Sequence, residues 1–66
     1  MENKEQICAL LLAACQETRY LGDMTALEYN PETETVTATF RGGAKKRINV
    51  LCDSGYALMK DVLKNL

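Results

Sequence analysis

Residues 24–52 alternate apolar and polar side chains in three short runs, and this pattern constrains the fold more than any other. A period of two is typical of β-strands that bury one face. Turn-forming residues separate the runs, at residues 30–33 and at the pair Gly42-Gly43. The segment therefore predicts a three-stranded antiparallel meander with strands at about 24–30, 35–41 and 46–52.

The first predicted hairpin has a definite register. A four-residue loop at 31–34 pairs Asn30 with Thr35 and keeps all apolar partners on one face, whereas a slip by one residue would separate them. The last loop residue, Glu34, is then expected at positive φ, where glycine would cost less. The remaining predicted pairs are Tyr29 with Val36, Leu27 with Ala38 and Thr25 with Phe40.

The second hairpin has a less definite loop. A two-residue loop at Gly42-Gly43 would set Ala38 against Arg47, so we expect a loop of three or five residues. The glycines supply the positive φ that a bulged hairpin needs. The five-residue version pairs Phe40 with Lys46, Ala38 with Ile48 and Val36 with Val50. The third strand then turns Ile48, Val50 and Cys52 toward the core.

One helix is predicted before the three strands in the sequence, at about 3–20, and one after them, at about 54–65. Asn3 followed by Gln6 has the form of a capping box, and Asp53 or Ser54 is expected to cap the second helix. The predicted class is α+β with the order α-β-β-β-α. We expect one small domain over 1–66, with both helices packed on one face of the sheet.

The first helix is apolar over most of its circumference, because residues 7–15 contain no charged side chain. Such a helix is usually buried on more than one side. We expect Cys8, Leu12 and Cys15 to lie on a flank beside the sheet-facing stripe, in contact with either the second helix or another subunit. The predicted stripe of the first helix is Ile7, Leu10, Leu11, Ala14, Thr18 and Leu21. That of the second helix is Tyr56, Met59, Val62, Leu63 and Leu66.

Length and charge narrow the functional classes. A domain of 66 residues buries only about 60% of the surface that its unfolded chain exposes, so a second subunit would add useful stability. The net charge of −1 gives no general attraction to nucleic acid. The apolar run 7–15 is too short to span a bilayer. Three cysteines without a secretory segment favour a reducing, cytoplasmic location, and no membrane partner is expected.

No catalytic, metal or cofactor signature is present in the sequence. The chain has no histidine and no C-x-x-C motif, so a zinc site would lack ligands. Cys8 and Cys15 lie about 10 Å apart along a helix, which is too far for a disulfide. Asp53 and Ser54 at a helix start are most simply a cap. We therefore expect no cofactor and no enzymatic activity.

The order of elements is similar to that of the double-stranded-RNA-binding domain. In that family the second helix opens with a basic cluster, and the first hairpin loop carries a histidine-containing motif. Here the corresponding segments read Asp-Ser-Gly-Tyr at 53–56 and Asn-Pro-Glu-Thr-Glu at 30–34. The resemblance extends to the order of elements and not to the motifs that contact phosphate.

Two functions follow as hypotheses. The first is a non-enzymatic protein-interaction module, either a homodimer or an adaptor or inhibitor of the kind that phages and mobile elements encode, with Cys8, Leu12 and Cys15 at the interface. The alternative is a nucleic-acid-binding accessory protein that uses half of all the basic residues. These are Arg41, Lys45, Lys46 and Arg47. Nucleic acid is not favoured, because no aromatic residue is expected on the outer sheet face for bases to stack on.

Overall fold

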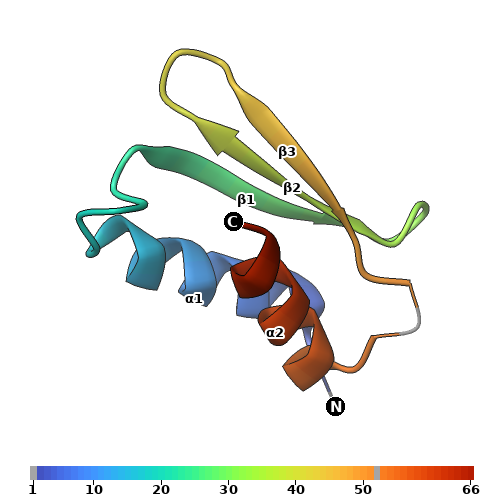
Figure 1. Ribbon diagram of the computed structural model, residues 1–66. Coiled ribbons are helices and arrows are strands. Elements are labelled where there is room, and N and C mark those ends of the chain that lie inside the picture. Colours follow the sequence, from blue (N-terminus) through green and yellow to red (C-terminus); the bar gives the residue numbers. More distant parts are fainter. Residues whose placement is uncertain (1, 52) are drawn as a thin grey trace.

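The computed structural model describes residues 2–51 and 53–66, and it has the predicted α+β architecture (Figure 1). The sheet is antiparallel with β2 between β1 and β3. The predicted order of elements and the antiparallel meander are confirmed. The elements are α1 (Lys4–Gln16), β1 (Met24–Asn30), β2 (Thr35–Phe40), β3 (Lys45–Asn49) and α2 (Gly55–Asn65).

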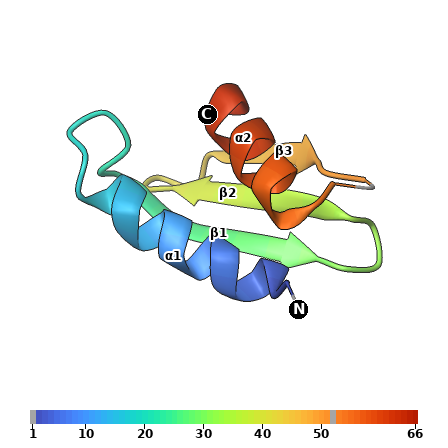
Figure 2. The ribbon, with the colours of Figure 1, turned by 90° about the horizontal axis from the view of Figure 1, so that it is seen from below.

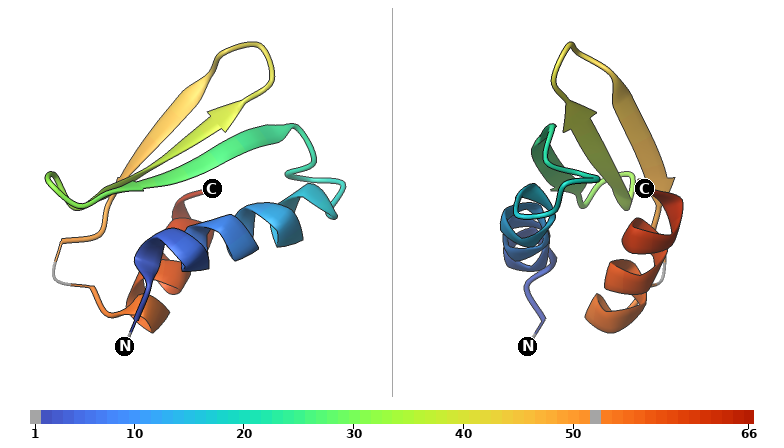
Figure 3. Two further views of the ribbon diagram at one scale, coloured as in Figure 1. Left: turned by 180° about the vertical axis from the view of Figure 1, so that it is seen from behind. Right: turned by 60° about the vertical axis from the view of Figure 1, so that its left-hand side comes forward.

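Both helices cover the same face of the sheet and leave the other face bare (Figures 1 and 2). Figure 2 shows α1 running along β1, whereas α2 lies over β2 and β3. The second hairpin rises away from the helical layer, as Figure 3 shows from two further directions. The molecule therefore has two layers, and the predicted packing of both helices on one face is confirmed.

The first hairpin has the predicted register from Asn30 opposite Thr35 back to Leu27 opposite Ala38. Glu34 closes the loop at φ +51°, as expected. The register shifts at the far end, where Met24 instead of Thr25 lies opposite Phe40. A β-bulge causes this difference because it adds one residue to β1 and not to β2.

The second hairpin closes with the three-residue loop at 41–43. The amide of Phe40 donates to the carbonyl of Ala44 at 2.8 Å, and Gly42 and Gly43 have φ of +93° and +96°. The five-residue pairing is wrong, because Val36 lies opposite Ile48 and Ala38 lies opposite Lys46. As a result β3 ends at Asn49, not at residue 52, and β2 ends one residue earlier than predicted. The expected inward position of Cys52 lies outside the described residues.

Helix α1 begins as predicted but ends at Gln16, not at residue 20. The Asn3 side chain accepts a hydrogen bond from the amide of Gln6 at 2.9 Å. At the other end, the Thr18 hydroxyl donates to the carbonyl of Cys15 at 2.6 Å and accepts from the amide of Leu21 at 3.0 Å. This hydroxyl turns the chain out of the helix, as Ser and Thr side chains commonly do near helix ends.

The face that α1 turns toward the sheet differs from the prediction. Cys8, Cys15 and Leu11 are buried, at 1%, 4% and 8% exposure, whereas Leu10 is 61% exposed. Small thiols allow α1 to lie close to β1, and this rotation carries the larger Leu10 outward. The core consists of Cys8, Leu11, Cys15, Met24, Leu27, Val36, Ala38, Ile48, Val50, Leu58 and Val62.

Helix α2 is capped by Ser54, whose side chain accepts from the amide of Ala57 at 3.2 Å. Its buried positions are Gly55, Leu58 and Val62, so the predicted inward positions of Tyr56 and Leu63 are wrong. A Cβ at Gly55 would lie 2.7 Å from Cδ1 of Ile7. Glycine at this position therefore lets the starts of the two helices approach each other.

Candidate protein-interaction face

An apolar face lies where α1 and α2 meet, and we call it the two-helix face. Each helix contributes three residues spaced i, i+3 and i+7, which places them on one side of that helix. The residues are Ile7, Leu10 and Ala14 from α1, and Tyr56, Met59 and Leu63 from α2. Between them lies a groove of about 250 Å³, lined by Ile7, Leu10, Leu11, Ala14 and Met59. No lining residue of this groove is ionisable.

Large apolar side chains are concentrated on this face. Five large hydrophobic side chains are exposed in the described part of the chain. Three of these, Leu10, Tyr56 and Leu63, belong to the two-helix face, with exposures of 61%, 71% and 51%. Exposed apolar residues that cluster around a groove mark interaction surfaces more often than scattered ones do. The face therefore has the composition of an unpartnered interface core.

The charged residues beside the face differ in sign between the two helices. On α1, Glu17 follows Ala14 by three residues, and it is the C-cap of the helix. On α2, Lys60 and Lys64 lie beyond Tyr56 and Leu63, and Nζ of Lys60 lies 5.7 Å from the centre of the Tyr56 ring. Glu17 at the end of α1 and the two lysines of α2 thus lie next to residues of the two-helix face in the sequence of each helix, and Arg19 follows Glu17 by two residues.

Two of the three residues predicted at a protein interface are buried in the folded chain, and the third is partly buried. Cys8 and Cys15 are buried against the sheet, and Leu12 is partly buried and packs against the core. Burial raises the pKa of both thiols above its usual value, because the charged thiolate is disfavoured away from water. Their role in the folded chain is to fill space between α1 and the sheet.

The structure also separates the four basic residues of the predicted nucleic-acid patch. Lys46 points to the inner face, where its ammonium donates to the carbonyls of Asn65 and Leu66 at 3.1 and 3.3 Å. Arg41 lies at the tip of the second hairpin. Lys45 and Arg47 are exposed in β3, but Glu28 lines the same hollow on that side of the sheet. Lys46 therefore lies apart from Lys45 and Arg47, which line one hollow together.

Two carboxyl groups meet at the start of α2. A hydrogen bond with Asp61 raises the pKa of Asp53 above its ordinary value, and burial and repulsion from Asp61 act in the same direction, whereas Lys4 lowers it. The second oxygen of Asp53, Oδ2, is buried without a partner among residues 2–51 and 53–66. Those residues contain no group of three or more side chains that could hold a metal ion.

Comparisons with protein-family models, curated proteins and solved structures found no match to this chain. No helix within the described residues is long and apolar enough to cross a membrane. The candidate site thus rests on the geometry of the two-helix face. The hydrophobic periodicity places Leu10, Tyr56 and Leu63 on buried stripes, whereas the structure exposes all three. On α2 a signal was present, because Lys60 and Lys64 are four residues apart next to Tyr56 and so mark that side as the solvent side.

Proposed function

We propose that this chain is a small protein-interaction module that assembles with a second copy of itself through the two-helix face. The observation that carries the proposal is the apolar groove between α1 and α2, which exposed Leu10 lines, together with exposed Tyr56 and Leu63 on the side of α2 that carries Met59. Burying such side chains against a partner stabilises a complex by roughly 25 cal/mol for each Å² of apolar surface.

The size of the helical side suits a homodimer. A stable dimer buries roughly 800 Å² on each partner. The accessible surface of the chain is 4601 Å², and its dimensions are 30 × 19 × 18 Å. One long side of a body with these proportions makes up about a fifth of the surface, which is close to the area that a dimer needs.

Charge favours a second copy as the occupant. In a two-fold symmetric dimer the same patch contacts itself, so α1 of one copy can lie against α2 of the other. That arrangement brings Glu17 of each copy toward Lys60 and Lys64 of its partner. By symmetry, the attraction between Glu17 and the two lysines occurs twice in the dimer and favours this pairing of helices. Burial of the apolar groove supplies most of the affinity.

Sedimentation of the purified protein over about a hundredfold range of concentration tests the proposal. We expect a reversible monomer–dimer equilibrium for the natural sequence. Leu10→Glu and Leu63→Glu place a charge inside the interface and are expected to give monomers. Leu51→Glu is the matched control, because Leu51 is 57% exposed and lies outside the two-helix face. It should dimerise like the natural chain.

A strict monomer at every concentration would refute self-association. So would dimers that persist in both Leu10→Glu and Leu63→Glu while circular dichroism shows an unchanged fold. Because the exposed positions tolerate charge in the monomer, these variants are expected to fold, and the result can be read from the association state alone.

A further inference from the structure

The free edge of the sheet beside α1 is β1. The strand order is β1-β2-β3, so β1 pairs with β2 on one side only. Phe40 directs its amide toward β3, and backbone directions alternate along a strand. Thr37 and Thr39 therefore bond to β1, through Glu28 and Ala26. It follows that the backbone N–H and C=O groups of Leu27 and Tyr29 point away from the sheet.

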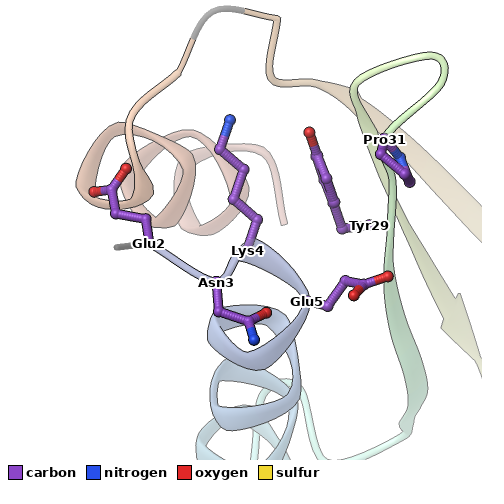
Figure 4. Close-up of a pocket in the computed structure, with 6 residues that line it drawn as sticks. All are labelled: Glu2, Asn3, Lys4, Glu5, Tyr29 and Pro31. Atoms are coloured by element: carbon purple, nitrogen blue, oxygen red, sulfur yellow. The ribbon is translucent and has the colours of Figure 1, made fainter.

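This edge is open to a ligand. A hollow of about 220 Å³ lies against it, lined by Glu5 from α1 and by Leu27, Glu28 and Tyr29 from β1. A second hollow of about 480 Å³ continues past Tyr29 to the start of α1. Figure 4 shows this second hollow, with the Tyr29 ring standing between Lys4 and Pro31. An extended chain laid along β1 would pass through both hollows.

Beyond the bulge after Met24, the β1 edge lacks the lysines and prolines that often protect exposed strands. Natural edge strands carry lysines, prolines or inward charges that prevent pairing with other chains. The opposite edge strand, β3, reads Lys-Lys-Arg-Ile-Asn. In contrast β1 reads Met-Thr-Ala-Leu-Glu-Tyr-Asn and has no basic residue or proline. An unprotected edge is suited to β-augmentation, in which a partner segment adds a strand through main-chain hydrogen bonds.

The charges along the β1 edge indicate what kind of segment binds there. Glu5 and Glu28 line the hollow at the edge, and Glu2 joins Glu5 in the neighbouring one. Among the described residues that line these hollows, Lys4 is the cation. Its ammonium lies over the Tyr29 ring, 5.5 Å from the ring centre. We propose that the β1 edge binds an extended, lysine- or arginine-bearing segment of a partner protein.

A second copy of this chain does not suit the edge. The antiparallel register that pairs Leu27 with Tyr29 of another β1 sets Glu28 opposite Glu28 of that copy. In the new ladder these two residues form a non-hydrogen-bonded pair, whose side chains are close together. Like charges directly opposite each other destabilise a strand pair. A basic residue at that position makes a favourable cross-strand pair instead.

The proposal also fixes where the basic residues of the partner lie. The residue opposite Glu28 projects on the outer face of the sheet, as Glu28 does. Its neighbours project toward α1, because successive side chains in a strand point to opposite faces. One of those neighbours therefore comes next to Glu5. Basic residues at every second position of the partner would therefore meet Glu28 on the outer face in one register, or Glu5 on the side of α1 in the register shifted by one residue.

The probe for the test is a capped peptide of alternating lysine and valine, titrated into the isotopically labelled protein at low salt. In the free protein we expect the amide protons of Leu27 and Tyr29 to exchange rapidly, while those of Ala26 and Glu28 are protected. Addition of the peptide should protect Leu27 and Tyr29. A peptide of the same charge with proline at every second position, and one with glutamate for lysine, should leave both amides unprotected.

Two variants test separately the outward backbone N–H of Tyr29 and the carboxylate of Glu28. Tyr29→Pro removes the outward N–H, and proline is tolerated where the N–H of an edge strand faces solvent. Tyr29→Ala is its matched control, because it also loses the ring but keeps the amide. We expect peptide binding with Tyr29→Ala and none with Tyr29→Pro. Glu28→Lys replaces attraction by repulsion and should weaken binding about tenfold.

The proposal fails if the peptide leaves the exchange of Leu27 and Tyr29 unchanged, or if the glutamate peptide binds equally well. It also fails if Tyr29→Pro binds like Tyr29→Ala. Peptide binding that changes only the amide signals of residues on the two-helix face would overturn the proposal as well. Its outcome is separate from that of dimerisation, because a monomeric Leu10→Glu variant should bind the peptide with the affinity of the natural chain.

Discussion

At the scale of single residues, the contact between Asp53 and Asp61 makes one contribution to stability depend on pH. A hydrogen bond with Asp61 is the main cause that raises the pKa of Asp53 in the folded chain. A group with a raised folded pKa stabilises the fold when protonated. Its contribution is complete below the unfolded pKa of about 4, and it is lost as the pH rises through the raised value.

The change Asp53→Asn tests this pair. An amide remains uncharged at neutral pH and can donate to the Asp61 carboxylate, so it preserves the contact that the ionised pair loses. We expect the variant to melt a few degrees above the natural protein at pH 7, and the difference should shrink on acidification to pH 4. Asp23→Asn, at an exposed carboxyl elsewhere, is the matched control. A shift of the same size at both pH values would contradict the assignment.

Residue-scale packing is also where the sequence was least informative. Residues 7–15 are all apolar, so hydrophobic periodicity could not give the rotation of α1 about its axis. The choice between Cys8 and Leu10 as the buried residue depends on how closely α1 approaches β1. That distance follows from the volumes of side chains on two elements and not from a pattern along one of them.

At the scale of elements, Lys46 joins β3 to the end of α2. Its ammonium donates to the carbonyls of Asn65 and Leu66, which are among the last carbonyls that a helix leaves without internal partners. A cation at this position also interacts favourably with the helix dipole. The strand residue opposite apolar Ala38 can therefore be a lysine, because its long side chain reaches the helix end.

Removal of this contact should cost a measurable part of the stability. We expect Lys46→Ala to lower the free energy of unfolding by about 0.5–1 kcal/mol, or the melting temperature by about 2–6 °C. Lys45→Ala is the matched control, because it is the adjacent strand position and is also exposed. Denaturant unfolding of both variants measures the difference. Equal losses in the two variants would show that Lys46 contributes no more than any lysine of β3.

The hairpins show which features of elements are readable from sequence. The register at Asn30 and Thr35 followed from side-chain alternation, because a slip by one residue would have turned every apolar residue outward. The bulge after Met24 and the three-residue loop at 41–43 did not follow. The three-residue loop preserves the alternation of faces, so the hydrophobic pattern is equally satisfied by more than one register. The bulge interrupts the alternation, because Met24 and Leu27 are both buried with two residues between them.

At the scale of the whole molecule, the arrangement of helices over the sheet creates the surfaces available to partners. The two-helix face needs the rotations of both α1 and α2, and the β1 edge needs the strand order. The fold class could be predicted because each element carries its own local signals. The candidate interface could not, because Leu10 and Met59 come to line one groove only after the two helices are packed.

Dimerisation through the two-helix face predicts that thermal stability depends on protein concentration. Two chains unfold from one dimer, so mass action favours the folded state as the concentration rises. We expect the melting temperature of the natural chain to increase by about 3–5 °C for each tenfold increase in concentration within the dimeric range. Leu10→Glu should melt at a temperature that is independent of concentration, whereas Leu51→Glu should follow the natural chain. Calorimetry at several concentrations measures this dependence, and equal behaviour of all three proteins would show that the face is not the dimer interface.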